Sequence, residues 1–250
     1  MGKMSELEGV YWIWLRDLKR FWRSTSRLIG SFAMPILFLV IFGAGFNFVR
    51  IGSVNYTTFL FPGIVAMSLL FTSLNSGISV IWDREFGFMK EILVSPILRI
   101  SIFIGKSLGG VSTAIIQGVI ILLLSFFIGI HISLTSFLIA LPIMVLISLG
   151  MVGLGLIIAS FVETFEGFGL IMNFINFPLF FTSGAIFPLD QAPTWLKAIS
   201  YVNPVTYGVD ALRQVLIGIS SLSFFTDILV VIVFTFATIL IGNLAFNRQK

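Results

Sequence analysis

Long apolar runs alternate with short polar or interrupted segments along the whole sequence of 250 residues. A run of about twenty apolar residues is long enough to cross a bilayer as an α-helix. On this basis the sequence predicts six membrane-spanning helices, which cover residues 28–49, 59–82, 102–128, 136–162, 168–183 and 224–246. The fifth of them is short for a full crossing. We therefore expect an all-α integral membrane protein with a single membrane domain over residues 1–250.

The N-terminal segment, residues 5–27, is too charged to span a membrane, although its apolar positions recur at helical spacing. Trp14 and Phe21 belong to the apolar side of this pattern, and Arg16 and Arg20 fall between the apolar positions. A helix of this kind lies in the plane of the membrane surface, where tryptophan is enriched. The sequence therefore predicts an interfacial amphipathic helix before the first span.

The longest charged interruption, residues 83–106, separates the second and third predicted spans. Its ionisable side chains cannot lie in hydrocarbon without partners, so we expect this segment to be in water. Phe88, Ile92 and Leu98 nevertheless give it the pattern of a short amphipathic helix that ends near Pro96. Such a helix either docks on another protein or lies on lipid headgroups, and the spacing alone does not decide between these two interpretations.

Residues 184–213 also interrupt the pattern, because they are too apolar for a solvated loop and too rich in Gly, Pro and charge for a span. Two short helices that dip partly back into the membrane fit best, with protein covering their broken backbone. Asp210 and Arg213 are three residues apart on the second of these helices. We expect them to form an intrahelical ion pair, or alternatively a latch against a symmetry-related copy.

Composition and charge narrow the class of protein further. Hydrophobic residues make up 58% and charged residues 10% of the chain, whereas soluble domains carry about 25% charged residues. The absence of cysteine excludes disulfide bonds, thiolate metal sites and cysteine nucleophiles. All lysine and arginine residues except Arg50, Lys197 and Arg213 lie in residues 1–27, in residues 83–106 or in the C-terminal tail. The positive-inside rule then places both termini and the 83–106 segment in the cytoplasm.

No catalytic or metal-binding residue is predicted in this chain. His131 is the only histidine, and it stands in a turn without partners for a metal site or a catalytic triad. Gly105-Lys106-Ser107 resembles the end of a phosphate-binding loop, but Ile100 occupies the position of the first glycine of that motif. Glu163 and Glu166 fit acids near a helix start better than a catalytic pair. A nucleotide would therefore have to bind to a separate chain.

Polar side chains within two predicted spans are candidates for lining a substrate path. They are Thr72 and Asn75 on a polar face of the second span, and Asn173, Asn176, Phe177 and Phe180 on the fifth. Amide groups beside aromatic rings suit an amphiphilic organic molecule. Hydrogen bonding and packing between helices account for the same residues, and the sequence leaves both interpretations open.

Three motifs, in this order on a six-span chain, resemble those of a known family. The first is Arg84-Glu85-Phe86-Gly87 followed by Glu91, Ser95-Pro96 and Arg99; the second is Ser183-Gly184-Ala185-Ile186-Phe187-Pro188-Leu189; the third runs from Asn203-Pro204 through Tyr207 and Asp210 to Arg213. Together they resemble the membrane permease subunits of type-2 ABC exporters, the ABC-2 transporter family. The nearest branch is the one that exports drugs and small amphiphiles.

This resemblance implies a permease subunit of the plasma or inner membrane that is not itself an enzyme. Two such chains, identical or sister chains, would pair and bind two ABC ATPase subunits, which would hold ATP and Mg, so this chain would carry no cofactor. The cargo would be an amphiphilic organic molecule, such as a drug, a lipid-like compound or a glycan-linked one. Residues 83–99 would form the coupling helix, and residues 184–213 would close the exit.

The resemblance also assigns roles to individual residues. The coupling residues would be Glu85, Gly87, Glu91, Ser95, Pro96 and Arg99. The outer gate would comprise Pro188, Asn203, Pro204, Tyr207, Asp210 and Arg213. The sequence departs from the family pattern at Phe88, where we expect a small polar residue, and at the apolar Ile97-Leu98.

The alternative interpretation is an ATP-independent membrane protein, either a channel-like pore or an assembly scaffold. A channel is expected to carry rings of charged side chains along its spans, and the predicted spans are nearly free of charge. An intramembrane enzyme is less favoured still, because no paired acids or metal ligands lie within the spans.

Overall fold

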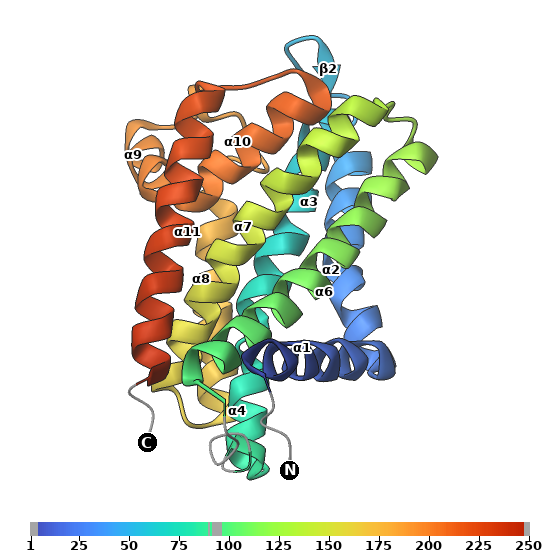
Figure 1. Cartoon of the computed structure of the whole chain (residues 1–250). Coiled ribbons are helices and arrows are strands. Elements are labelled where there is room, and N and C mark those ends of the chain that lie inside the picture. The colour runs from blue at the N-terminus through green and yellow to red at the C-terminus, as the bar shows by residue number, and fades with distance from the viewer. Residues whose placement is uncertain (1–4, 90, 92–96, 248–250) are drawn as a thin grey trace.

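The computed structural model describes residues 5–89, 91 and 97–247. Long helices run side by side through the molecule, and α1 lies across their ends (Figure 1). Within the described residues, the segments long and apolar enough to cross a membrane are α2 (Thr25–Gly45), α3 (Tyr56–Asn75) continued by α4 (Ile78–Glu85), α6 (Arg99–Ile128), α7 (Leu134–Phe161) and α11 (Phe224–Asn247). The helix α8 (Phe165–Phe181) is apolar too, but it has only 17 residues, and its crossing of the membrane as a sixth span stays a prediction. The expected all-α membrane fold is confirmed.

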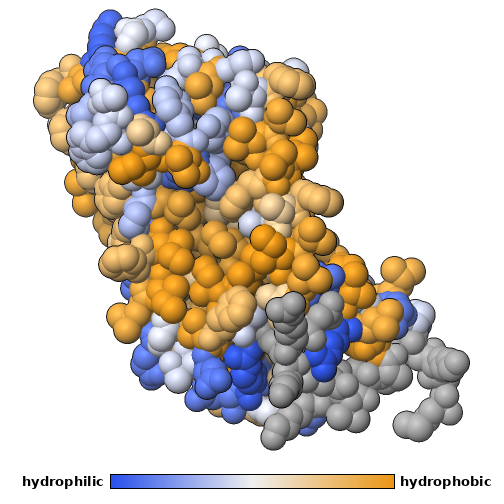
Figure 2. All heavy atoms as spheres, turned by 90° about the vertical axis from the view of Figure 1, so that its left-hand side faces the viewer, coloured by the Kyte–Doolittle hydropathy of each residue, from blue (hydrophilic) through white to orange (hydrophobic). Residues whose placement is uncertain are grey.

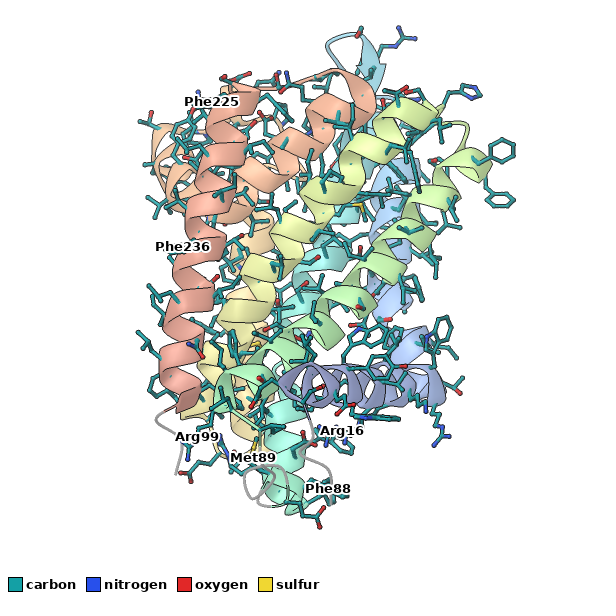
Figure 3. The ribbon with its side chains drawn as sticks, in the orientation of Figure 1. Arg16, Phe88, Met89, Arg99, Phe225 and Phe236 are labelled. Atoms are coloured by element: carbon teal, nitrogen blue, oxygen red, sulfur yellow. The ribbon has the colours of Figure 1, made fainter. Side chains whose placement is uncertain are left out.

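The surface supports the same conclusion. Figure 2 shows a broad apolar band across the middle of the molecule, with hydrophilic residues gathered at its two ends. On α11, Phe225 and Phe236 are 75% and 70% exposed and point away from the other helices (Figure 3). Large apolar patches of this extent are not left in water by a soluble monomer, so this band is the face that meets lipid or a partner chain.

The helix α3 is the centre of the fold. Its residues from Phe59 to Leu70 are all buried, packed among α2, α6, α7 and α10. A Cβ atom on Gly155 of α7 would lie 2.3 Å from the carbonyl oxygen of Leu74, and one on Gly77 would lie 2.4 Å from the carbonyl oxygen of Gly155. The two helices therefore touch backbone to backbone at the point where α3 gives way to α4, which only glycine permits.

The helix α1 (Glu6–Arg23) begins at Ser5, whose hydroxyl accepts a hydrogen bond from the Glu8 amide in a capping box. It packs closely on α6: a Cβ atom on Gly105 would lie 2.9 Å from the Cβ of Ile13. The indole nitrogen of Trp14 donates to the Ser112 hydroxyl over 2.9 Å. The predicted amphipathic N-terminal helix is present, and its inner face is held by protein.

The opposite end of the molecule carries the hairpin of β1 (Arg50–Ile51) and β2 (Val54–Asn55), and α10 and α9 lie toward the same end (Figure 1). The described segments here are η1 (Leu189–Gln191), α9 (Thr194–Val202) and α10 (Pro204–Ile217), so the sequence correctly anticipates two short helices. We call this the hairpin end, and the end where α1 lies the α1 end.

Candidate functional site

Five charged side chains meet at the α1 end, where α1, α4 and α6 converge. Asp83 is their centre: its carboxylate accepts hydrogen bonds from Arg16, Arg20 and Lys106. The Lys106 ammonium also lies 3.3 Å from the Asp17 carboxylate. The side chains of Asp83 and Lys106 are both fully buried. We refer to these five residues as the charge network.

The expectation that the whole 83–106 segment lies in water is therefore wrong for Asp83 and Lys106. The helix α4 continues the second span as far as Glu85, and α6 already begins at Arg99, so both residues are part of packed helices. Burial of a charge is tolerated because the ions pair with each other and their remaining hydrogen-bonding groups are largely satisfied. The Ser79 hydroxyl and carbonyl oxygens lie 3.2 and 3.3 Å from the Lys106 ammonium and complete its surroundings.

Two further side chains fix the ends of the 83–99 connection. The Glu6 carboxylate accepts hydrogen bonds from the Leu98 amide at 3.0 Å and from the Ser101 hydroxyl at 2.6 Å, at the start of α6. These bonds, first that of Ser101 and then that of Leu98, lower the pKa of Glu6 below its usual value. At the other end, Arg84 donates to the carbonyl oxygen of Val162 over 3.0 Å, just after α7. The connection is thus tied to α1 on one side and to α7 on the other.

The residues at the end of α4 and just beyond it, which we call the tip, are largely exposed and include charged and aromatic side chains. The helix ends at Glu85, and Gly87 turns the chain with a φ of +79°, a conformation that side chains with a Cβ rarely adopt. Phe86 and Phe88 are 60% and 47% exposed, while Met89 packs back into the protein. Phe88 lies at the far α1 end of the molecule (Figure 3). Charged and aromatic side chains therefore project together from the end of a clamped span.

Of the other predicted coupling residues, Glu91 is exposed, and Arg99 is the exposed first residue of α6. Ser95 and Pro96 lie outside the described residues, as does Ile92 of the expected amphipathic helix. The proposed coupling role of all six residues stays a prediction.

The candidate path residues fall into an exposed and a buried group. Asn75 and Asn173 are exposed, whereas Asn176 and Phe180 are buried in the subunit. The rings of Phe71 and Phe177 meet edge to face at 5.5 Å, where the antiparallel helices α3 and α8 pack. Positions 75 and 173 each lie about one turn from this contact toward the α1 end, so the two exposed amides are at the same level.

Thr72, the remaining path candidate, donates its hydroxyl to the buried Gln117 of α6. Gln117 in turn donates to the carbonyl oxygen of Ser31 on α2. In this structure Thr72 therefore links three helices. The role of the six candidates in transport stays a prediction.

At the hairpin end, the expected intrahelical ion pair between Asp210 and Arg213 is wrong. Asp210 accepts backbone hydrogen bonds at 2.8–3.1 Å from Ser221 and Leu222, which closes the connection into α11. Arg213 donates to the Gly184 carbonyl oxygen over 2.9 Å and lies 4.0 Å from the Phe59 ring centre. Each buried charge binds backbone of another segment, so i, i+3 spacing does not bring the two together.

The other predicted gate residues organise the same end. Asn203 caps α10 through the Val205 amide and donates to the Leu179 carbonyl oxygen over 2.6 Å, which joins α10 to α8. Pro204 occupies the first turn of α10, where its missing N–H is no loss. The Tyr207 hydroxyl donates to the Tyr201 carbonyl oxygen over 2.7 Å. Pro188 precedes the turn of η1. A gating role for these six residues stays a prediction.

Comparison with known proteins identifies the family. Residues 8–217 match the family described as ABC-2 type transporter. This chain belongs to the ABC-2 transporter family. It is 27% identical over 244 residues to the inner membrane transport permease YadH of Escherichia coli K12, covering 93% of this chain and 94% of YadH. It is 32% identical over 197 residues to ycf38 of Cyanophora paradoxa, a candidate transport permease by its name, covering 76% and 68%.

A third relative bears a more specific name. The protein called a probable multidrug ABC transporter permease, YbhR of Escherichia coli K12, is 28% identical over 171 residues, covering 68% of this chain and 46% of YbhR. Membership of the ABC-2 family makes this chain a membrane transport permease. It does not by itself specify the cargo.

Sequence reasoning about this ABC-2 permease missed the residues that hold the 83–99 connection, namely Glu6, Arg16 and Arg20. One feature of the sequence pointed to such contacts. Asp83 and Lys106 stand at the ends of apolar runs, and a charged side chain next to a membrane-spanning segment requires a partner. The identity of the partners was not accessible, because Arg16 is 67 residues from Asp83 and Glu6 is 92 residues from Leu98.

Proposed function

We propose that this chain is the membrane half of an ATP-driven exporter, in which two permease chains pair and two ABC ATPase subunits dock at the α1 end. The α1 end and both termini then face the cytoplasm. The cargo is an amphiphilic organic molecule that leaves the cytoplasm or the inner leaflet.

The observation that carries this proposal is that the exposed tip directly follows Asp83, which is held by buried ion pairs. Glu85, Phe86 and Phe88 project beyond the membrane-spanning part, and Asp83 directly before them is held by cations of α1 and α6. Aromatic and charged side chains are the groups that anchor protein interfaces. A displacement imposed on the tip is transmitted to α1, α4 and α6 together, because a buried ion pair resists separation.

The path for the cargo is proposed to follow the exposed amides of Asn75 and Asn173 and the adjacent Phe177. This surface lies where α3 and α8 meet, and in a paired permease a second copy would enclose it. Amide hydrogen bonds orient the polar part of an amphiphile, and the aromatic rings take its apolar part.

Docking is tested with Glu91→Arg, introduced into the permease purified together with an ABC ATPase that binds the wild-type chain. We expect the ATPase to dissociate from the complex, or ATP hydrolysis to continue without export. The substitution replaces a negative charge at the proposed interface by a positive one, which turns attraction to a basic partner group into repulsion. Glu163→Arg is the matched control, since Glu163 is also exposed at the α1 end, between α7 and α8. Equal export and equal ATPase retention in the two variants would contradict the docking surface.

The path is tested with the double variant Asn173→Leu and Phe177→Ala. We expect altered export of amphiphilic compounds, with the permease still paired and still bound to its ATPase. Phe236→Ala on the outer face of α11 is the control for loss of an exposed ring. Unchanged export of every compound tested would exclude this path.

A further inference from the structure

A cavity of about 410 Å³ lies between α1, α2, α3, α4 and α6, beside the charge network. It is not sealed, because Met34 on its α2 side is 40% exposed and Asn75 on its α3 side is also exposed. Volumes of roughly 300–1,000 Å³ are typical of sites for small organic ligands. Two of the path candidates, Thr72 and Asn75, are among its lining residues.

The lining of the cavity is graded from charged to apolar. Asp17 and Arg20 belong to α1, at the cytoplasmic side of the proposed orientation, and Phe21 follows them. Met34 and Phe71 form an apolar wall deeper along α2 and α3. Most of the other lining residues are small or hydroxyl-bearing and leave the space open, among them Gly30, Ser31, Ser76, Gly109, Gly110 and Thr113. A ligand that fits must itself be polar at one end and apolar along its length.

The sign of the charge on that ligand follows from the network. Arg16, Arg20 and Lys106 outnumber Asp17 and Asp83, so the five groups carry one excess positive charge. The second terminal nitrogen of Arg20, Nη2, lies 3.3 Å from Asp83. Arg20 lines the cavity and its side chain is 26% exposed, so its positive charge is within reach of a ligand there. An anionic group beside it would gain a charge-assisted interaction with the guanidinium.

The position of the cavity suits a molecule held in the membrane. The helix α1 lies across the ends of the spans (Figure 1). A headgroup beside Arg20 would be at these ends, and the rest of the molecule would extend among Phe21, Met34 and Phe71. This is the arrangement of an amphiphile in one leaflet.

We propose that this cavity binds an anionic amphiphile, with a phosphate or carboxylate headgroup on Arg20 and a hydrocarbon tail between α2 and α3. A resident phospholipid and an acidic cargo share this chemistry. The site is a property of the permease chain alone, so it does not depend on whether the proposed export function is correct.

Binding is measured by native mass spectrometry on the purified full chain, with phosphatidylglycerol, phosphatidylcholine and inorganic phosphate as the probes. We expect phosphatidylglycerol to bind most tightly. Arg20→Gln should weaken its binding about tenfold or more, the effect of losing a charge-assisted hydrogen bond. Arg23→Gln is the matched control, because it removes one positive charge from the same helix at an exposed position outside the cavity.

A second variant leaves the charge network intact. Met34→Trp fills the cavity from α2 and should displace phosphatidylglycerol, whereas Ile41→Trp on the exposed side of the same helix should not. The proposal is overturned if phosphatidylcholine binds as tightly as phosphatidylglycerol. It is also overturned if the control variants lose as much binding as Arg20→Gln and Met34→Trp, or if inorganic phosphate binds as well as the lipid.

The two sources of the amphiphile are separated by adding the ATPase. Phosphatidylglycerol that stays bound through ATP hydrolysis supports a resident lipid, and loss that requires ATP hydrolysis supports a cargo. Failure of the docking test on Glu91 would leave the binding measurement unaffected, so the two proposals are tested separately.

Discussion

Asp83 and Lys106 show how single residues carry the organisation of the α1 end. Both side chains have no exposed area, and each has a second partner in α1. Their burial is possible only as a set, because removal of one partner leaves the other charge desolvated and unpaired. The same pairing positions α1 against α4 and α6. The same contacts therefore stabilise the buried charges and hold α1 in its position.

The first prediction concerns Asp83. Asp83→Ala should destabilise the permease by about 3–5 kcal/mol, because Lys106 and two arginines lose their common acceptor. The measurement is thermal unfolding of the detergent-purified chain. The double variant Asp83→Leu with Lys106→Met should recover much of the loss, since two apolar side chains replace a buried ion pair. A double variant less stable than Asp83→Ala would contradict this account of the network.

The second prediction concerns pH and Glu6. Because the folded-state pKa of Glu6 lies below its usual value, ionised Glu6 stabilises the fold above the unfolded-state pKa. This contribution is lost as the pH falls through the folded-state pKa. Glu6→Gln should therefore be less stable than the wild type at neutral pH, and the difference should shrink on acidification. Thermal unfolding between neutral and acidic pH measures it, and Ser101→Ala should reduce the same difference. A difference in stability between the wild type and Glu6→Gln that does not change with pH would exclude this role of the Glu6 carboxylate.

At the scale of elements, glycines decide how closely the helices pack. Gly150 and Gly153 of α7 face α11, where added Cβ atoms would lie 2.8 Å from Thr235 and 3.0 Å from Thr238, while Gly155 faces α3. Three glycines on one helix thus serve two different interfaces, and the one against α3 meets backbone.

The third prediction follows from that difference. Gly155→Val should cost more stability than Gly169→Val, because the Leu74 carbonyl oxygen cannot move aside as a flexible side chain can. Around Gly169 nothing lies within 4 Å of an added Cβ, so only the β-branched side chain in a helix is penalised there. Expression level and unfolding temperature of the two variants provide the comparison. Equal losses would mean that α3 and α7 do not touch as described.

A fourth prediction concerns the link between α10 and α11. Asp210→Ala should destabilise the hairpin end by about 1–3 kcal/mol, because the amides of Ser221 and Leu222 lose their acceptor. Asp210→Asn, which keeps one acceptor oxygen, should lose less. Limited proteolysis of the 218–223 connection reports the effect locally. If the negative charge of Asp210 matters rather than its hydrogen bonds to the backbone, the 218–223 connection would be cleaved equally fast in both variants.

At the scale of the whole molecule, the charge network and the packing of α1 on α6 indicate that α1, α4 and α6 move as one body. Trp14, Ile13 and the charge network hold α1 on α6, and Asp83 holds α4 to both. The tip at Phe86 and Phe88 belongs to this body. Arg84 extends the connection to the end of α7. A push on the tip therefore reaches several spans at once.

The fifth prediction tests this unit. Ile13→Cys with Gly105→Cys places two thiols in a chain that has no native cysteine. Their Cβ atoms would lie 2.9 Å apart, below the roughly 3.5–4.5 Å of a disulfide, so the two helices must part by about 1 Å to accommodate the bond. Oxidation should leave export intact, because the joined helices do not separate during transport. The reduced double variant is the control for the substitutions themselves. If oxidation stops export and reduction restores it, α1 must leave α6 during the cycle.

The long apolar helices, the amphipathic N-terminal helix, the two short helices after residue 184 and the family could all be predicted from the amino-acid sequence alone. These features are local, because the bilayer acts as a uniform solvent and hydropathy over about twenty residues reports it directly. The tertiary structure decided which charges are buried and with what partners. Asp83 and Lys106 were expected in water, and Asp210 and Arg213 were expected to pair with each other. Their actual partners come from distant segments, and only the packed fold brings those segments within hydrogen-bonding distance.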